Sequence, residues 1–536
     1  MADYTKEKVP SDHAVPTYGE DTVPDDRLVR QLKSRHIAMI SIGGVIGTGL
    51  FLGSGGALAN GGPVGLWLGY IIMGSITYAV MVSLGEMVSY LPIPGGHIKL
   101  AERFVNPALS LTMGWNYWYN WIIILPAELS AAAVLINYWV SPTRVNNAAW
   151  ISICIVVVIT INMFGARAYG ECEFWFASIK VITITGLIIL GIILDLGGGP
   201  DHDRLGFRFW KHPGPFVQFD GIPGATGRFA GWWAVMTQAA FSFIGTEIVA
   251  IAAGEAKNPR RNIPRAIKKV YIRILLFYIL GTFIIGILVP SNNPDLGAQS
   301  NAFSSPFVIA IRRAGIKGLP SVINAALLTS AWSAASSDLY TSSRALYGLA
   351  ISHNAPQIFA RTTRSGLPYV SIIFSSLFCA LAYMGVKSGS NKVFGWFANM
   401  TSIAGLMTWF GIGVTYIRFH AGLKAQGIDR NTLPFKSPLQ PFLSWYVVVS
   451  TLVICFFSGF SVFIKGHWDH ATFVTNYLPF ALFPLMYIFG RYFMYRTPAV
   501  RPHEMDFVSG IAEIEADTYD EDEPKNGLER FWQWLM

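Results

Sequence analysis

Charged residues are scarce in this chain. Only 13% of its 536 residues are Asp, Glu, Lys or Arg, which is about half the share of an ordinary soluble domain. Hydrophobic residues make up 52%, and they gather in about twelve runs long enough to cross a bilayer as helices. The short segments of alternating polarity that a transmembrane barrel needs are missing. The sequence therefore predicts an all-α, polytopic membrane protein.

Three further features are missing. The polar N-terminal segment has no short apolar core followed by a small-residue cleavage site, so we expect no cleaved signal. The four cysteines lie in or beside apolar segments without metal-ligand spacing, which predicts neither a disulfide framework nor a metal site. The glycine-rich stretch that begins at Gly43 lacks the Lys-Ser/Thr pair of a phosphate-binding loop. We therefore expect no metal and no other cofactor.

The apolar runs define the predicted spans. They cover residues 37–59, 64–84, 110–140, 149–166, 174–195, 231–254, 270–290, 320–350, 370–386, 394–418, 443–464 and 475–495. Alternate connections are rich in Lys and Arg, as at 256–270, 359–367 and 418–436, whereas the opposite-side loop near 197–207 is not clearly less basic. The positive-inside tendency places the basic connections and both termini in the cytoplasm. The net charge of +8 then reflects membrane orientation, and we expect no binding of nucleic acid.

Two of the spans are interrupted by glycine. The first contains Gly43, Gly44, Gly47 and Gly49, and the sixth has Gly245 at its centre. Glycine disfavours helix by about 1 kcal/mol relative to alanine, so local unwinding is inexpensive there. Unwound backbone at membrane depth is tolerated only where it is buried in protein or lines a cavity. Paired broken segments in the two halves of a membrane protein are typical of the substrate site of a secondary transporter.

The two breaks present opposite chemistry. Unwinding at the first exposes backbone N–H groups at the start of a half-helix, with the Thr48 hydroxyl beside them, which suits a carboxylate. The second, at Ile244 and Gly245, leaves the carbonyl groups of residues 241–244 without helical partners, which suits an ammonium group. Together they fit a zwitterion. The alternative is that these glycines only allow helices to pack closely.

Ionisable residues inside spans are functional candidates by default. Four stand out: Glu128 beside Pro126, Lys180, Glu247 after the second break, and Asp338. Each could instead form a structural ion pair or an interhelical hydrogen bond. Lys180 is the most informative, because a lysine withdrawn from water can gain and lose a proton during a transport cycle. Its ammonium group could also stand where a sodium ion would brace a broken helix, which favours proton coupling over sodium coupling.

Several long motifs occur in order along nearly the whole chain. They are SIGGVIGTGLFLGSG at 41–55, LPAELSAA at 125–132, FSFIGTEIVAIAAGEAKNPRRNIPRA at 241–266 and SSRALYGLA at 342–350. Taken together, these motifs resemble the fungal amino acid permease family of the amino acid–polyamine–organocation transporters.

The resemblance implies a LeuT-like fold and proton-driven uptake of L-amino acids across a fungal plasma membrane. Residues 37–195 would form a first repeat and 231–418 an inverted second repeat with discontinuous helices 1 and 6. Two extra helices would follow at 443–495, between cytoplasmic tails at 1–36 and 496–536. Carried over by motif, the substrate site would include Gly47, Thr48, Gly49, Phe241 as a gate, Ile244, Gly245, Glu128 and Asp338, with Lys180 and Glu128 in coupling. Asp338 departs from the family, because relatives often have an uncharged residue there.

We therefore predict a proton-coupled amino acid importer that works by alternating access and is not an enzyme. Its partners would be the amino acid, protons and membrane lipids, and its tails are candidate sites for ubiquitin ligases and adaptors. Neutral amino acids or proline are favoured because no anionic cluster beyond Asp338 marks a cationic site. The alternatives are a basic amino acid permease and a non-transporting sensor of the same fold. A short N-terminal tail disfavours the sensor, and scattered histidines disfavour a membrane-bound transferase.

Overall fold

A computed structural model describes residues 46–93, 95–248, 267, 270–296, 305–509 and 511, apart from the side chains of Ser388 and Asn391. Within these ranges the chain is helical and forms no strand. The long helices are α2 (Ser54–Tyr90), α4 (Pro107–Ile136), α6 (Ala166–Asp195), α13 (Leu319–Ile351) and α16 (Ser390–Ala425). The shorter α-helices are α3 (Gly96–Phe104), α5 (Asn147–Met163), α7 (Arg208–Lys211), α8 (Gly224–Phe243), α11 (Leu280–Leu288), α12 (Pro306–Arg313), α14 (Tyr369–Ser376), α15 (Met384–Ser388), α17 (Phe442–Phe457) and α18 (His470–Phe489). Three π-helical turns are η1 (Gly49–Gly53), η3 (Ile274–Ile279) and η9 (Gly490–Met494).

Seven of the described helical segments are long and apolar enough to cross a membrane. They are Gly49–Tyr90, Pro107–Ile136, Ala166–Asp195, Val270–Leu288, Tyr369–Lys387, Lys392–Ala425 and His470–Met494. Two shorter apolar helices are α5 and α17. The structure thus supports a helical protein with many membrane spans, as the composition predicts. The predicted span at 320–350 coincides with α13. This helix is not among the seven segments because its many serines lower its mean hydropathy.

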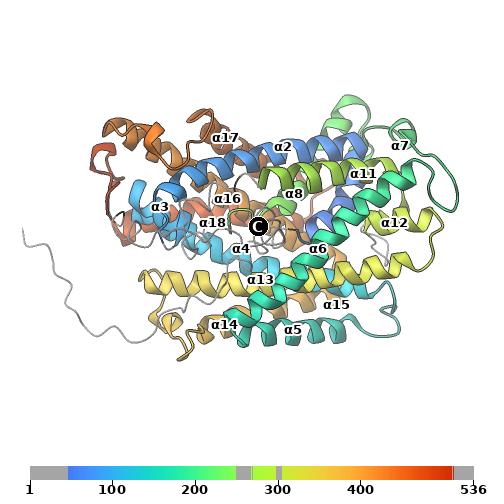
Figure 1. Cartoon of the computed structure of the whole chain (residues 1–536), viewed down its shortest axis with the longest axis horizontal. Coiled ribbons are helices and arrows are strands. Elements are labelled where there is room, and N and C mark those ends of the chain that lie inside the picture. The colour runs from blue at the N-terminus through green and yellow to red at the C-terminus, as the bar shows by residue number, and fades with distance from the viewer. Residues whose placement is uncertain are drawn as a thin grey trace, which may run out of the picture.

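The helices pack in two groups around a shared centre. Figure 1 shows α2, α8 and α11 side by side, and α2 packs against both of the others. In the second group α13 packs along α4, α5 and α6, and α16 contacts α4 as well as α8. The most apolar stretch of α4 is 89% buried, against 39% for α6 and 28% for the segment that contains α18. We conclude that α4 lies at the centre and that α6 and α18 face outward.

Gly62 separates the first two predicted spans. The chain runs helically from Gly49 to Tyr90 but is kinked at Gly62, where φ is 74° and ψ is 174°. A Cβ atom there would lie 2.8 Å from the Pro215 carbonyl oxygen, so no larger residue fits without a backbone shift. Pro63 follows directly and starts the next helical turn. The predicted boundary between residues 59 and 64 therefore corresponds to a sharp bend between two helical stretches.

Residues 500–509 pack across one end of the helix bundle, and we call this segment the strap. Arg103 of α3 donates hydrogen bonds to the carbonyl oxygens of Asp506 (2.6 Å) and Ser509 (2.7 Å) and pairs with the Asp506 carboxylate at 2.7 Å. Burial alone would raise the pKa of Asp506, but hydrogen bonds from Ser509, Val508 and Arg103 hold it well below its usual range. A carboxyl with a depressed pKa loses its stabilising contribution only as the pH falls through that low value. The ion pair between Arg103 and Asp506 that holds the strap therefore persists at neutral and mildly acidic pH.

Phe507 anchors this strap. Its side chain is 1% exposed and packs against the rings of Tyr90, Phe104 and Phe419. Replacing Phe507 with alanine is expected to lower the free energy of unfolding by about 3–5 kcal/mol, the usual cost of emptying a buried phenylalanine site. Thermal unfolding of the detergent-solubilised protein measures this change. The neighbouring Val508, which is 76% exposed, is the matched control, and an equal loss on Val508→Ala would contradict the anchoring role.

Candidate functional site

Helix α8 ends in the middle of the sixth predicted span. Its last residue is Phe243, Ile244 takes an extended conformation with ψ of 144°, and Gly245 has φ of 93°. A side chain at Gly245 would be strained in that conformation, and its Cβ would lie 3.1 Å from the Trp121 ring. The helix is thus interrupted at Gly245, as predicted, and the interruption is buried in the centre of the protein. The rest of that span beyond Ile248 lies outside the described residues.

The backbone groups at this break are partly satisfied. The Thr246 hydroxyl donates to the Phe243 carbonyl oxygen at 2.6 Å, and the Glu247 carboxylate accepts from the Gly245 N–H and the Trp409 indole, each at 3.2 Å. Of the carbonyl groups of residues 241–244, that of Phe243 thus accepts a hydrogen bond from a side chain instead of from the next helical turn. Phe241 is 5% exposed, and its ring lies edge-on to Phe394 at 5.6 Å between centroids.

The first broken segment meets α8 at its last turn. Gly43 and Gly44 lie outside the described residues; the chain is not helical at Ile46 and Gly47, and the helix begins at Thr48. A Cβ atom on Gly49 would lie 2.8 Å from the Ser242 Cα atom, so only glycine permits this approach. The positive N-terminal end of one helix therefore lies beside the negative C-terminal end of another.

Thr48 is joined to the centre of α4 by a hydrogen bond. Its hydroxyl donates to Glu128 Oε1 at 2.7 Å, and both side chains are buried. Gly47 lies next to the same oxygen, because a Cβ atom there would be 3.6 Å from Glu128 Oε1. The other oxygen, Oε2, is buried without a hydrogen-bond partner among the described residues. The Thr48–Glu128 pair thus links the start of the first helix to α4.

A second buried charged group lies between α6 and α13. Lys180 Nζ is 3.8 Å from Glu173 Oε1, and the two side chains are 0% and 1% exposed. Ser333 of α13 donates to Glu173 Oε2 at 2.6 Å. Asp338, also on α13 and 3% exposed, interacts electrostatically with Lys180, Glu173 and Glu128. Because Glu128 also interacts with Lys180, the two groups form one buried cluster, which we call the ionic cluster (Thr48, Glu128, Glu173, Lys180 and Asp338).

Hydroxyl and amide groups surround the ionic cluster on α13. The Tyr169 hydroxyl donates to Ser337 Oγ at 3.0 Å, and Asn162 Nδ2 donates to the carbonyl and hydroxyl oxygens of Ser336 at 3.1 and 3.2 Å. Asp338 Oδ2 is buried without a hydrogen-bond partner among the described residues. The serine-rich sequence of α13 therefore gives the cluster a polar wall inside an otherwise apolar core.

The sequence identifies most of these residues as candidates, but it does not identify Glu173. The predicted fifth span began at residue 174, so Glu173 was counted as part of a connection. In the structure α6 begins at Ala166 and places Glu173 well inside the helix. The signal that would have found it is the seven-residue spacing to Lys180, which puts both side chains on one helix face.

A second buried carboxylate, Glu86, was missed for the same reason, because the predicted span ended at residue 84. It is 0% exposed and accepts two hydrogen bonds from Arg430 at 2.8 Å each, which raise the pKa of that guanidinium. The Tyr416 hydroxyl and the Ser437 N–H donate to the same carboxylate, each at 2.8 Å. This pair ties the end of α2 to the connection between α16 and α17 and has no contact with the ionic cluster in the described residues.

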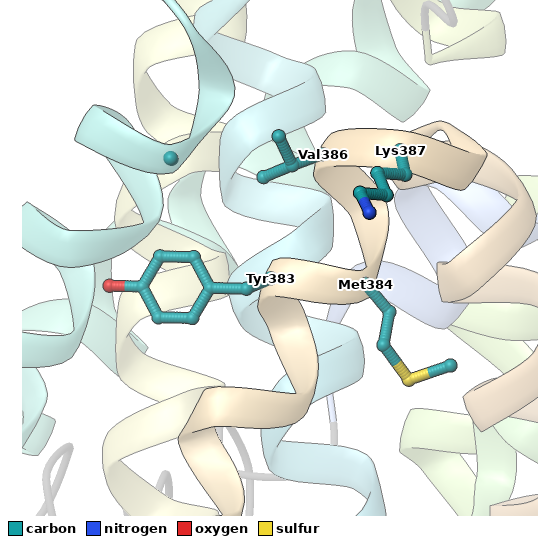
Figure 2. Close-up of a pocket in the computed structure, with 5 residues that line it drawn as sticks. Tyr383, Met384, Val386 and Lys387 are labelled. Carbon is teal, nitrogen blue, oxygen red and sulfur yellow. The ribbon is translucent and has the colours of Figure 1, made fainter.

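A surface hollow lies elsewhere. It has a volume of about 460 Å³ and is lined by Ala148, Tyr383, Met384, Val386 and Lys387. Figure 2 shows the side chains of the last four around it, and the Tyr383 hydroxyl reaches Ser152 of α5 at 2.6 Å. None of these residues belongs to the ionic cluster or to either helix break. The hollow therefore plays no part in the candidate site.

Similarity to known proteins shows the family to which this chain belongs. Residues 36–503 match the amino acid permease family. This chain belongs to that family. It is 43% identical over 517 residues to a proline-specific permease of Emericella nidulans, covering 95% of this chain and 93% of that one. It is 42% identical to two permeases of Saccharomyces cerevisiae: a dicarboxylic amino acid permease (90% and 79% covered) and a lysine-specific permease (95% and 83% covered).

Proposed function

We propose that this permease imports L-amino acids together with protons across the plasma membrane of a fungal cell. One observation carries the proposal. The start of the first described helix and the end of α8 meet in the buried interior, and the Thr48 hydroxyl connects that meeting point to Glu128. The three relatives are named for the transport of amino acids, which supports the substrate class. Twelve spans, a LeuT-like inverted repeat and cytoplasmic termini are part of the same proposal.

The two helix ends supply complementary groups for a zwitterion. Backbone N–H groups at Gly47–Gly49 and the Thr48 hydroxyl would hold the substrate carboxylate. The carbonyl groups of Phe241 and Ile244 would accept hydrogen bonds from the substrate amine, and Gly245 permits the backbone to turn away between them. Phe241 would close over the bound amino acid, because its ring already lies beside Gly49.

Glu128 would couple proton binding to substrate binding through Thr48. A hydroxyl group has only one hydrogen to donate, and in the structure Thr48 donates it to Glu128. A proton on Glu128 would weaken that hydrogen bond and leave the Thr48 hydroxyl available to the substrate carboxylate. Lys180, which interacts with Glu128, would take part by changing its own charge during the cycle.

The ionic cluster also bears on substrate choice. Neutral amino acids or proline remain the favoured substrates, because three carboxyl groups share one lysine and none is exposed to attract a cationic side chain. A basic amino acid is the second candidate, favoured by the unpartnered Oδ2 of Asp338. The proline-specific relative is 43% identical to this chain and the lysine-specific relative is 42% identical, so both kinds of substrate are candidates.

Asp338→Asn is expected to lower competition by lysine relative to competition by proline. The substitution removes one negative charge from the cluster and preserves the size of the side chain, so any affinity for a cation should fall most. The ratio of the two inhibition constants against labelled substrate measures this change. An unchanged ratio would assign Asp338 a structural role on α13.

Labelled proline uptake in cells that lack other permeases tests the proposed function. Uptake should rise as the external pH falls and should collapse when the proton gradient is dissipated. Competition by a panel of unlabelled amino acids then ranks the substrates. Uptake that does not depend on the proton gradient would reject the coupling, and the absence of uptake of any amino acid would favour a sensor of the same fold.

A further inference from the structure

Glu173 contacts both a neighbouring helix and the lysine of the ionic cluster. Ser333 of α13 donates to its Oε2 atom at 2.6 Å, whereas its Oε1 atom lies 3.8 Å from Lys180 Nζ. Because Glu173 and Lys180 are seven residues apart on α6, both project from one face of the same helix. The Ser333 contact fixes the carboxylate against a neighbouring helix, and the lysine then lies within its reach.

The separation of the two charges is also informative. At 3.8 Å the pair attracts strongly but exceeds the usual length of a charge-assisted hydrogen bond, which is about 2.7–2.9 Å. Both side chains are buried, so little water screens their interaction. A buried anion at this distance stabilises the positive charge of its partner.

The titratable groups around the pair come from three helices. Tyr169 and Cys172 of α6 interact electrostatically with Glu173, Asp338 faces it from α13, and Glu128 of α4 interacts with Lys180. Asp338, Glu128 and Glu173 each retain one buried oxygen atom without a hydrogen-bond partner among the described residues. In Glu173 that atom is the one that faces Lys180, while the other accepts the hydrogen bond from α13.

We propose that Glu173 is the fixed counter-ion of Lys180 and thereby sets the pH range over which the permease couples proton entry to amino acid entry. This inference rests on the proposed proton coupling and adds a positioning residue to it. Glu173 acts through Lys180, and its contacts among the described residues are with Ser333 and Lys180, away from the helix ends that would hold the amino acid. Its loss should therefore change the pH profile of uptake more than the apparent affinity for substrate.

Glu173→Gln tests the proposal, because it removes the charge and preserves the shape. The pH above which uptake declines is expected to move down by about one to three pH units, because removing a nearby opposite charge shifts a proton-binding equilibrium by about that amount. The apparent affinity, measured at the pH optimum of each protein, should change little. Glu171→Gln is the matched control, because Glu171 is only half-buried on the same helix and its replacement should leave the profile unchanged.

Two outcomes would overturn the proposal. The first is a Glu173→Gln protein that reaches the cell surface and has the pH profile of the unmodified permease. If that variant does not reach the surface, the double variant Glu173→Gln/Lys180→Met, which removes both charges, is expected to do so. The second outcome that would overturn the proposal is a double variant that also fails to reach the cell surface. An unmodified permease whose uptake ignores pH would instead reject the proton coupling itself.

Discussion

Replacing Thr48 with valine is expected to abolish uptake while the protein still reaches the cell surface. Valine preserves the shape of threonine but cannot donate the 2.7 Å hydrogen bond to Glu128. Hydrogen bonds to charged groups contribute about 1.5–3 kcal/mol, so losing this one in the transport cycle corresponds to a fall of roughly 10- to 150-fold in uptake. The same change removes the proposed hydroxyl donor for the substrate carboxylate, which makes the larger value the better expectation.

Uptake of labelled amino acid per molecule at the cell surface measures this effect. Thr48→Ser is the control, because serine keeps the hydroxyl and loses only a methyl group. We expect the serine variant to retain most of the uptake. Normal uptake by the valine variant would refute the carboxylate site, and equal loss in both variants would show that the methyl group, and therefore packing, matters at this position.

Glycine patterning predicted the centre of the site, because glycine in an apolar span has a local physical consequence. The break at Gly245 follows from helix propensity alone and coincides with the end of α8 at Phe243. The close approach of Gly49 to Ser242 depends instead on how two distant segments pack. No periodicity in either segment encodes that contact. The first break itself was predicted at glycines that begin at Gly43, of which only Gly47 and Gly49 fall within the described residues.

The ionic cluster could be predicted only in part. Glu128, Lys180 and Asp338 were recognised because a charge inside an apolar run is conspicuous. Their proximity across α4, α6 and α13 is a tertiary property, which one sequence does not carry. Glu173 and Glu86 were missed because hydropathy places span boundaries only within a few residues. Both lie one or two residues outside a predicted span but well inside a helix of the structure.

These two misses have a shared physical meaning. A buried carboxylate is tolerated where a fixed cation or hydroxyl compensates it, and each of these has such a partner. Arg430 compensates Glu86, whereas Ser333 and Lys180 compensate Glu173. Glu86 fastens α2 to a connecting segment, while Glu173 joins the cluster that would carry protons. Both carboxylates are buried, so their partners distinguish their roles: Glu86 anchors a connecting segment, whereas Glu173 belongs to the ionic cluster.

Lys180→Met is expected to separate amino acid entry from proton entry. The substitution leaves Glu128, Glu173 and Asp338 without the cation they share. Removing one partner of a buried ion pair costs about 3–5 kcal/mol, so less protein should reach the surface. The molecules that do reach it should take up amino acid at a rate that no longer rises as the external pH falls, because the remaining carboxyl groups would lack the cation that they share.

Parallel measurement of labelled amino acid uptake and of proton entry, each scaled to the surface level, tests this expectation. Lys180→Arg is the decisive control, because arginine keeps the positive charge but does not release its proton in proteins. If Lys180 couples by titrating, the arginine variant should recover the surface level yet still lack proton-driven uptake. Proton-driven uptake by the arginine variant would instead make Lys180 a permanent cation and leave Glu128 and Asp338 as the groups that carry the transported proton.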